Sequence, residues 1–508
     1  MSSAVDTSRT PSQGSDSPYG AGRRAGRRAS TGVLFGGLGL AAAAVVLLLM
    51  ADTLGLPKQA VGTLVIVLSI VLFLVGIPVG IAMLGASLLG LLSLGGPRVI
   101  RSTLEAVGYD PTASWSYSVI PMFILMGTLL WKSGLTASAF EATRNWIGWV
   151  PGGLAVATNF AGAGLAAGSG STIGITYAVG RVAIPEMLRS GYKPSLATGA
   201  VAAAGTLGQI IPPSLLLVVY AGAAGVAVGP QLLAGVVPGI LLAVAFAVVV
   251  VVRASINKSL APRGLSRPVT WGERWRSLVG ILPIVAVVLI VVGGIFFGIF
   301  TATEAGVFGA LAALVTGVWH KFRTERSWRA LWTMFRESVM VTLVGTASIF
   351  LLLVGVYALT RVVALSQIAN ALAKWIVGFG LGRVELLLVL VVLYLILGMF
   401  MDTLSMMLLT IPVLLVPLQA VGVDLLFFGV FLVIMAEVGL MTPPLGILSF
   451  IVHRIASDPT VNLGQRVSLG EVFRGTVWFV AAALAVVALL IFVPDVVTWL
   501  PSLGTSAG

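Results

Sequence analysis

A set of residues able to hold a small cation occurs twice in this chain at a constant spacing. Thr172 ends a Gly-Ser-Gly-Ser-Thr run, and Thr403 ends a Met-Asp-Thr run. These two threonines are 231 positions apart, and so are Pro212 and Pro443, the first members of two Pro-Pro pairs. Hydroxyl and carboxylate oxygens, beside carbonyls released from helical pairing, are ligands suited to Na⁺. The spacing therefore predicts two related cation sites.

Each Pro-Pro pair, Pro212-Pro213 and Pro443-Pro444, lies inside a long apolar run. Proline donates no backbone hydrogen bond and disfavours helical geometry at the residue before it, so both runs are expected to break there. In hydrocarbon, broken backbone is tolerated only where protein buries it or where it lines a cavity. Two matching breaks in corresponding halves of a membrane protein indicate a central site for a transported solute.

The composition is that of a polytopic membrane protein. Hydrophobic residues make up 58% of the 508 and charged residues 9%, against about 25% charged residues in soluble proteins. The net charge of +12 comes from basic residues in short loops beside apolar runs, which argues for membrane topology and against a nucleic-acid partner. Because the chain has no cysteine and two histidines, thiolate chemistry and a zinc site are both disfavoured.

Five segments are expected along the chain. Residues 1–30 form a disordered basic cytoplasmic tail, and 31–56 form an extra N-terminal transmembrane helix that is retained rather than cleaved as a signal. Residues 57–277 form a first repeat and residues 278–495 a second. Residues 496–508, which hold no lysine or arginine, form an extracytoplasmic tail.

Each repeat is expected to contain a re-entrant hairpin and a broken membrane helix. The hairpins cover about 151–188 and 384–419. In the first, apolar segments of about 15 residues are short for a full span, and the second half of the chain repeats the plan. The broken helices cover about 194–225 and 424–456. Two basic loops on the cytoplasmic side orient the second repeat opposite to the first. We therefore expect an all-α polytopic membrane protein made of two inverted-topology repeats.

The residues around the two breaks resemble one known family. The first break reads Ala-Ala-Gly-Thr-Leu-Gly-Gln-Ile-Ile-Pro-Pro-Ser over 203–214, after Pro-Glu-Met at 185–187. The second reads Glu-Val-Gly-Leu-Met-Thr-Pro-Pro over 437–444, after Gly-Met-Phe-Met-Asp-Thr at 398–403. In this order the motifs resemble the large membrane subunit of the tripartite ATP-independent periplasmic (TRAP) transporters, over roughly residues 60 to 493.

The resemblance implies an elevator-type, Na⁺-coupled importer of carboxylate-bearing solutes, such as C4-dicarboxylates or sugar acids, in the cell inner membrane. It implies a small four-helix membrane subunit and an extracytoplasmic substrate-binding protein as partners, and no cofactor besides Na⁺ as the coupling ion. This chain departs from the family pattern at three places. Segment 126–130 lacks the usual carboxylate, Ala302 stands where a proline is usual, and the N-terminal helix is additional.

We predict two cation sites with the solute between them. The first comprises Ser169, Gly170, Ser171, Thr172, Gly205, Thr206 and Gly208. The second comprises Asp402, Thr403, Gly439, Thr442 and Pro443. The solute is expected to receive hydrogen bonds from Thr172, Ser214 and Thr403. For any single glycine or serine in these sets, close helix packing is the alternative role.

Acids inside the membrane are functional hypotheses, because burying one costs at least ~2.5 kcal/mol on insertion scales. Asp402, at a predicted hairpin tip, is the strongest of them. Glu437, one turn before the second Pro-Pro pair, either tunes a cation site or pairs with a neighbouring helix. Glu304 is expected to cap a helix start, and Arg181 and Arg361 are expected to extend to an interface.

Two other functions stay open at this point. A stand-alone sodium/dicarboxylate symporter of related architecture would need no binding protein. An ion channel would also explain polar breaks at the midplane, although channels more often carry rings of charge or a continuous polar stripe. An enzyme is not expected, because it would need a nucleophile with its base or a metal cluster, and His320 and His453 lie at the ends of spans.

Overall fold

The computed structural model describes residues 35–110, 112–169, 172–262 and 269–505, without the side chains of 136–137 and 165–169. The predicted tail at 1–30 and the site residues Gly170 and Ser171 lie outside the described residues. All regular secondary structure in the described part is helical. The all-helical prediction is therefore confirmed.

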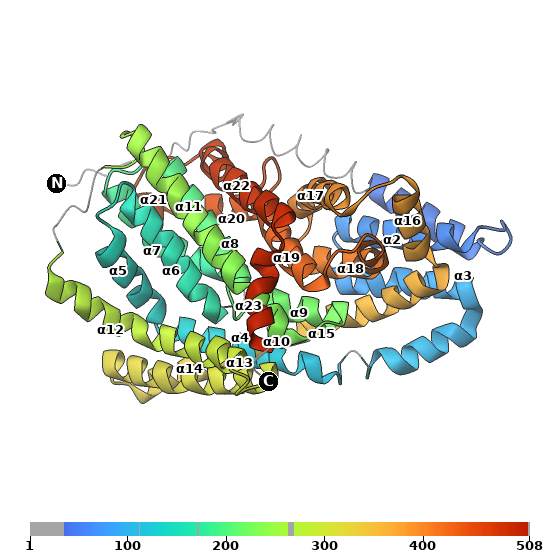
Figure 1. Cartoon of the computed structure of the whole chain (residues 1–508), viewed down its shortest axis with the longest axis horizontal. Helices are drawn as coiled ribbons and strands as arrows, with labels where there is room; N and C mark the ends of the chain where they lie inside the picture. Colours follow the sequence, from blue (N-terminus) through green and yellow to red (C-terminus); the bar gives the residue numbers. More distant parts are fainter. Residues whose placement is uncertain (1–34, 111, 170–171, 263–268, 506–508) are drawn as a thin grey trace, which may run out of the picture.

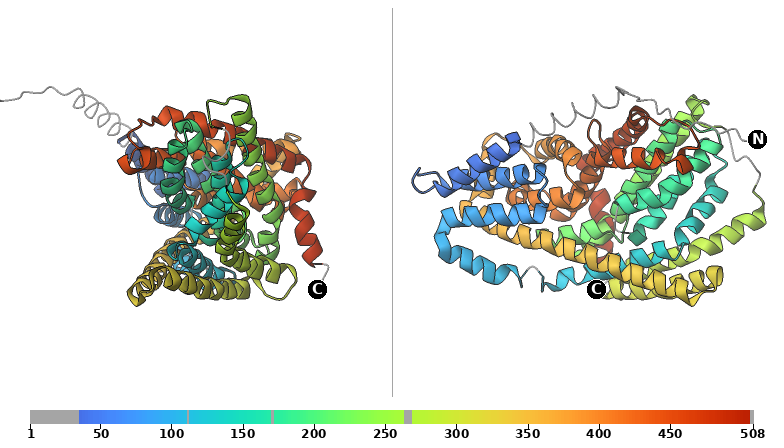
Figure 2. Two further views of the ribbon diagram at one scale, coloured as in Figure 1. Left: turned by 90° about the vertical axis from the view of Figure 1, so that its left-hand side faces the viewer. Right: turned by 180° about the vertical axis from the view of Figure 1, so that it is seen from behind.

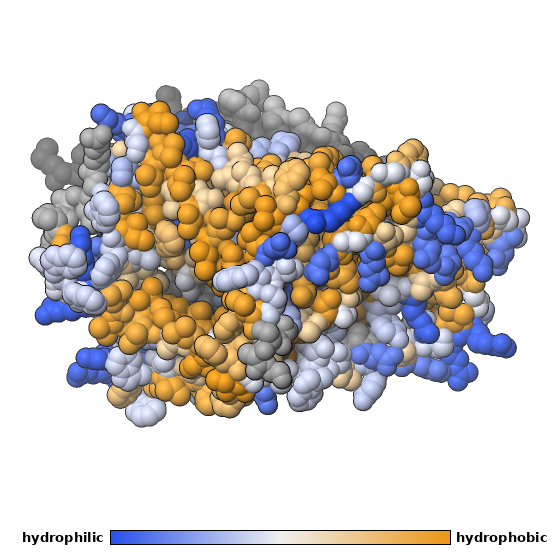
Figure 3. Space-filling model, viewed as in Figure 1, coloured by the Kyte–Doolittle hydropathy of each residue, from blue (hydrophilic) through white to orange (hydrophobic). Residues whose placement is uncertain are grey.

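Eight helices of the described part are long and apolar enough to cross a membrane, or nine if the bent pair α8 and α9 is one span. Large apolar side chains cover much of the outside: on α11 (Val236–Ile256), Ile240, Val244, Val248 and Val252 are all exposed at a four-residue spacing. That spacing places them on one face of the helix. Figure 3 shows a broad apolar area across the middle of one face, with hydrophilic residues at its edges. The chain is a multi-pass membrane protein.

The N-terminal part holds the helix Phe35–Leu49 and four numbered helices. Their bounds are α2 Lys58–Leu74, α3 Val79–Val107, α4 Val119–Lys132 and α5 Leu135–Ile147, with the short 3-10 helix η1 at Trp115–Tyr117. Phe35–Leu49 is apolar but has fewer residues than the eight candidate spans. It lies against α3, where the Ser93 hydroxyl donates to the carbonyl of Leu48.

One succession of helices with nearly equal lengths occurs twice. The first is α6 Gly153–Ser169, α7 Thr172–Arg189, α8 Pro194–Ile210, α9 Leu215–Ala224, α10 Val228–Ala234 and α11 Val236–Ile256. The second is α17 Arg383–Phe400, α18 Thr403–Ala420, α19 Leu425–Met441, α20 Ile447–Ala456, α21 Pro459–Asn462 and α22 Leu469–Phe492. We call α6 with α7 the first hairpin and α17 with α18 the second hairpin.

Between and after these sets lie helices that cover the outside of the molecule. Their bounds are α12 Trp271–Val288, the π-helix η2 Leu289–Gly293, α13 Gly294–Phe296, α14 Ala302–Glu325, α15 Trp328–Ser366, α16 Ile368–Gly378 and α23 Asp495–Thr505. In Figure 1, α12 and α14 lie along the lower left edge, and α15 extends behind the centre to pack along α3 at the right. Figure 2 shows α15 from behind, where its length is in view. The segment expected as a tail at 496–508 includes α23, which packs on α10 and α11.

The breaks in α8–α9 and α19–α20 follow from the Pro-Pro pairs. Helix α8 ends at Ile210, directly before Ile211 and Pro212, and α9 begins after them at an angle of 44°. Helix α19 ends at Met441 and α20 begins at Ile447, on either side of Pro443. Helices α8 and α19 are buried on every side over most of their lengths, which is the pattern of core helices. The first break therefore lies inside the protein, whereas Pro444 and Leu445 at the second break are exposed.

Helices α17 and α18 have 18 residues each and pass as candidate spans by length and composition. Length alone therefore does not mark the second hairpin as re-entrant. An 18-residue helix rises about 27 Å, close to the thickness of the hydrocarbon core of about 30 Å. Whether the hairpins are re-entrant stays a prediction that depends on where their tips lie.

Three charged residues outside the breaks have local partners. Thr301 and Glu304 form a capping box at the start of α14, as the sequence predicts. The guanidinium of Arg361 donates to the Thr103 hydroxyl at 3.3 Å, and Arg181 lies 3.7 Å from the carboxylate of Asp458. The hydroxyl and the amide of Thr460 lower the pKa of Asp458 below its ordinary value, with a smaller contribution from Arg181.

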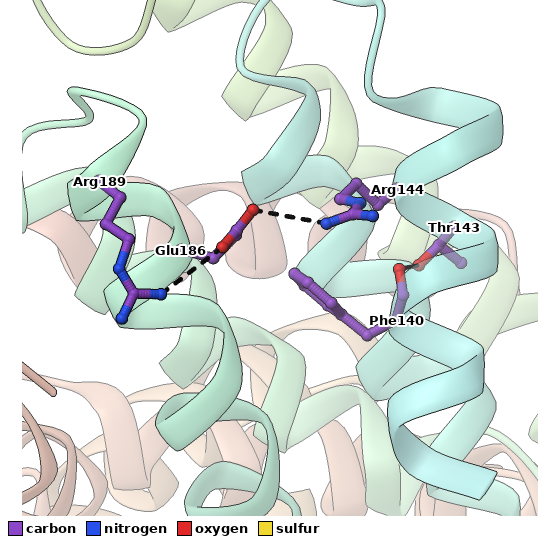
Figure 4. Close-up of polar contacts among 5 residues, drawn as sticks. All are labelled: Phe140, Thr143, Arg144, Glu186 and Arg189. Carbon is purple, nitrogen blue, oxygen red and sulfur yellow. Dashed lines mark hydrogen bonds and ion pairs between the residues drawn. The ribbon is translucent and has the colours of Figure 1, made fainter. Parts of the chain in front are cut away.

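An ion pair joins α5 to the second helix of the first hairpin. Arg144 on α5 lies 3.4 Å from Glu186 on α7, and Arg189 lies 3.9 Å from the other oxygen of Glu186 (Figure 4). The side chains of Arg144 and Glu186 are about one third exposed, at 34% and 35%.

We expect Arg144→Ala to change the free energy of unfolding by less than ~1 kcal/mol, because water screens a pair that is about one third exposed. Thermal unfolding of the purified variant in detergent, compared with Arg101→Ala at an exposed pair, measures this change. A clearly larger loss than in Arg101→Ala would show that the pair holds the hairpin in place.

Candidate functional site

A cavity of about 160 Å³ lies where the two hairpin tips meet the two helix breaks. Its lining combines polar residues with an apolar majority: Thr172, Ile173, Gln209, Leu216, Asp402, Thr403, Leu404, Glu437, Leu440, Ile447, Leu448 and Ile451. These residues come from both halves of the chain. No lysine, arginine or histidine is among the described residues that line the cavity.

Four helices begin at this cavity. The first two residues of α7, of α18 and of α20 line it, and so does the second residue of α9. The start of a helix carries amide groups without helical partners and a partial positive charge of about +0.5. Four helix starts converging on one small space favour an anionic group there.

Glu437 is at the centre of this arrangement. It lies on α19, it is 0% exposed, and both its oxygens accept hydrogen bonds from Thr172 at 2.9 Å. One of these oxygens also accepts from Thr403 at 3.1 Å. The two threonines at equivalent positions of the two hairpins therefore donate to a single carboxylate. Of the two roles open for Glu437, pairing with neighbouring helices is observed, and its place in the cavity lining leaves a role toward a cation open.

Asp402 lies at the tip of the second hairpin and lines the cavity from its exposed edge. Its carboxylate accepts a hydrogen bond from the amide of Ser405 at 3.1 Å and so caps the start of α18. One carboxylate oxygen is thereby used inside the chain, and the exposed position leaves the other available to a ligand.

Gln209 is a site residue that the sequence analysis missed. It is 5% exposed, lines the cavity, and its side-chain oxygen has no hydrogen-bond partner in the described structure. A buried polar atom without a partner is uncommon and indicates a ligand or water. The only signal in the sequence was one amide residue among small apolar residues just before Pro212.

The remaining residues predicted around the first break lie in or beside α8. Gly205 faces α7 so closely that a Cβ atom there would overlap the hydroxyl of Thr176. The Thr206 hydroxyl donates to Ala203 at 2.9 Å, within its own helix. Ser214 caps α9 and donates to the carbonyl of Gln209. Their predicted ligand roles are not tested by these contacts.

Two of these positions are defined by the backbone alone. Gly208 is buried in the last turn of α8. Its carbonyl has no helical donor, because Pro212 has no N–H. Ser169 is the last residue of α6, and its side chain is outside the described part.

The residues predicted around the second break are also close to the cavity. Gly439 lies against Gly398 of α17, with 2.7 Å between a Cβ built on Gly439 and the Cα of Gly398. Thr442 follows the end of α19, and its hydroxyl donates to Val438 at 2.7 Å. Pro443 and Pro444 leave the carbonyls of Gly439 and Leu440 without their usual helical donors. The amide of Thr442 bonds the carbonyl of Gly439 instead, at 3.0 Å.

Comparison with known proteins now identifies the family. Residues 66–496 match the family described as "Tripartite ATP-independent periplasmic transporter, DctM component". The chain belongs to this family. It is thus a large permease subunit of the TRAP type, and the resemblance predicted from the break motifs is confirmed.

Relatives and a solved structure agree with this assignment. The C4-dicarboxylate TRAP transporter large permease protein DctM of Pseudomonas aeruginosa is 31% identical over 80% of this chain and 90% of its own length. The ectoine/5-hydroxyectoine TRAP transporter large permease protein UehC of Ruegeria pomeroyi is 28% identical over 86% of this chain and 98% of its own. The YdaH transporter of Alcanivorax borkumensis shares the fold, with a TM-score of 0.55, 16% identity, and 79% of this chain and 89% of that chain covered.

Proposed function

We propose that this TRAP permease imports small carboxylate-bearing solutes across the inner membrane, driven by Na⁺ and dependent on a substrate-binding protein. The observation that carries the proposal is the cavity at which both hairpin tips and both helix breaks meet. A central site built from two broken helices is the arrangement of a carrier and not of a continuous pore.

Na⁺ fits the oxygen atoms that the two breaks provide. Pro212 and Pro444 deprive the carbonyls of Gly208 and Leu440 of helical donors, and Asp402 adds a carboxylate at the cavity edge. Within the described residues no group of three or more His, Asp or Glu side chains could hold a metal ion. Carbonyls, hydroxyls and single carboxylates suit an alkali cation better than a transition metal. We therefore keep the two Na⁺ sites as predicted, one at each break.

The repeated helix succession supports an inverted repeat. Basic residues after α11 and after α14 lie on the cytoplasmic side by the positive-inside rule, which orients α12 oppositely to α2. Because Thr172 and Thr403 bind the same buried carboxylate, both hairpin tips reach one central point. Two hairpins that enter from opposite sides and meet at the middle are re-entrant, and alternating access then follows from moving this unit against α12, α14 and α15 as an elevator.

The partners and solutes follow from family membership. Other permeases of the family are named for C4-dicarboxylates and ectoine, and the system is by its description tripartite. We therefore propose a small membrane subunit, for which the exposed apolar face of α15 offers area, and an extracytoplasmic binding protein. The extra helix Phe35–Leu49 packs on α3 and adds to the large subunit.

Replacing Asp402 by alanine is expected to reduce the stimulation of solute uptake by Na⁺ at least about tenfold, because a charged ligand is lost at the cavity edge. Uptake by the complex reconstituted in liposomes, over a range of Na⁺ concentrations, measures this effect. Asp424→Ala is the matched control, since Asp424 caps α19 as Asp402 caps α18 but does not line the cavity. Equal Na⁺ dependence in Asp402→Ala and the wild type would remove Asp402 from the site.

The same liposomes separate the alternative functions. Uptake that does not need the binding protein would favour a stand-alone symporter, and single-channel currents would favour a pore. Na⁺-driven uptake that needs the binding protein supports the proposal.

A further inference from the structure

The cavity is asymmetric in the groups that it presents to a solute. On one side it has acceptors without an opposite charge, and on the other it has a helix start without a cap. We infer that the transported solute carries a carboxylate at one end and a cationic, hydrogen-donating nitrogen group at the other. This inference rests on the proposed function and narrows its solute class to small zwitterions.

Glu437 and Gln209 form the acceptor side. Both oxygens of Glu437 lie 2.9 Å from the single hydroxyl of Thr172, and one of them lies 3.1 Å from that of Thr403, so both hydrogen-bond partners are neutral. None of the ion pairs in the described structure involves Glu437. Ionising a buried carboxyl group without an opposite charge is costly, so Glu437 gains most from an ammonium or amidinium group beside it.

The orphaned oxygen of Gln209 is a second and independent observation on this side. The residue is 95% buried and lines the same cavity, and this oxygen can only accept a hydrogen bond. A donor group of the solute would satisfy the carboxylate of Glu437 and the amide oxygen of Gln209 together. A second carboxylate on the solute would satisfy neither oxygen.

The start of α20 forms the anion side. Gly446 supplies no side-chain cap there, whereas Ser214 caps α9 and Asp402 caps α18. The first two residues of α20, Ile447 and Leu448, line the cavity. Their amide groups have no helical acceptor by position, and the helix dipole adds positive potential. A carboxylate of the solute therefore fits at α20, and a second carboxylate beside Glu437 would supply no opposite charge there.

The size of the cavity agrees with a short carbon chain between the two charged ends. Its volume is about 160 Å³. Leucine and isoleucine side chains make up most of its wall, at Ile173, Leu216, Leu404, Leu440 and Ile451. Apolar walls around a few fixed polar groups are typical of small-solute sites.

Three four-carbon probes that differ only in their end groups test this inference: 4-aminobutanoate, succinate and 1,4-diaminobutane. Binding to the purified full-length chain in detergent is measured by calorimetry, with Na⁺ and with K⁺ in its place. In Na⁺ we expect 4-aminobutanoate to bind at least about tenfold more tightly than either other probe, because it alone carries both an ammonium group for Glu437 and a carboxylate for the start of α20. Glu437→Gln should reduce this preference over succinate about tenfold, and the exposed acid Glu385 changed to glutamine should not.

The outcomes distinguish this inference from the proposed function. Succinate binding in Na⁺ as tightly as 4-aminobutanoate, or no binding of 4-aminobutanoate, overturns the zwitterion inference and leaves Na⁺ coupling in place if succinate needs Na⁺. Preference for 4-aminobutanoate that is equal in Na⁺ and K⁺ keeps the inference and contradicts Na⁺ coupling. The relative affinities of the three probes are measured on the wild-type chain, so misfolding of Glu437→Gln would not affect this comparison.

Discussion

Changing Thr172 and Thr403 together to valine is expected to lower the free energy of unfolding by about 3–5 kcal/mol, because a buried carboxyl group then loses both of its hydroxyl donors. Each single change should cost less, about 1.5–3 kcal/mol, because one hydroxyl still donates to Glu437. Valine keeps the shape of threonine, so the loss reports the hydrogen bonds and not a cavity. Equilibrium unfolding in detergent, followed by circular dichroism, measures the difference.

A third substitution makes this prediction sharper. Adding Glu437→Met to the double variant should restore most of the stability, since removing both partners of a buried polar contact is nearly neutral. Transport should be lost in this triple variant, because Glu437 and both threonines line the cavity. Thr128→Val is the control, because the Thr128 hydroxyl is buried but donates within its own helix. If the double variant is no less stable than Thr128→Val, the two hairpins are not held through Glu437.

The helix breaks could be read from the sequence because proline acts locally. Pro212 and Pro443 remove donors and restrict the residue before them wherever they occur. The expected helix start at Pro194 is the start of α8, and the expected break before Ser214 separates α8 from α9. Family membership was also within reach, since the ordered motifs around these prolines are specific.

The role of Glu437 could not be read from the sequence, because its partners are distant in the chain. The duplicated spacing of 231 matches Thr172 with Thr403, but it matches Glu437 with Thr206, an uncharged residue bonded within its own helix. A search for symmetric pairs therefore passes over a carboxylate shared by both halves. Only the folded chain brings Thr172 within 2.9 Å of a residue 265 positions away.

The start of α14 differs from the family pattern, because a capping box stands where a proline is usual. Ala302 is the first residue of α14, a position at which proline is common because its missing N–H is not needed there. In this chain the Thr301–Glu304 capping box satisfies the helix start instead. The departure at Ala302 noted in the sequence therefore leaves α14 in place.

Replacing Gly475 by alanine is expected to destabilise the fold more than adding a methyl group at any other described glycine in the core. A Cβ atom at Gly475 would lie 2.0 Å from the carbonyl oxygen of Ser195 and 3.0 Å from the amide of Gly199, both backbone atoms of α8. Backbone in a buried helix cannot move aside as a side chain does, so α22 must separate from α8. Overpacking of this kind costs about 1–3 kcal/mol in well-packed cores, and more where backbone must shift.

Because α8 carries Gln209 and leads to the first break, separating it from α22 should also disturb the cavity. We expect a large loss of monodisperse protein after detergent extraction and no measurable uptake by what remains. Gly470→Ala on the same helix is the control, since the nearest atom to a Cβ there is the Ser468 hydroxyl at 3.9 Å. Yield and melting temperature of Gly475→Ala equal to those of Gly470→Ala would mean that α8 and α22 pack less closely in the membrane than this geometry requires.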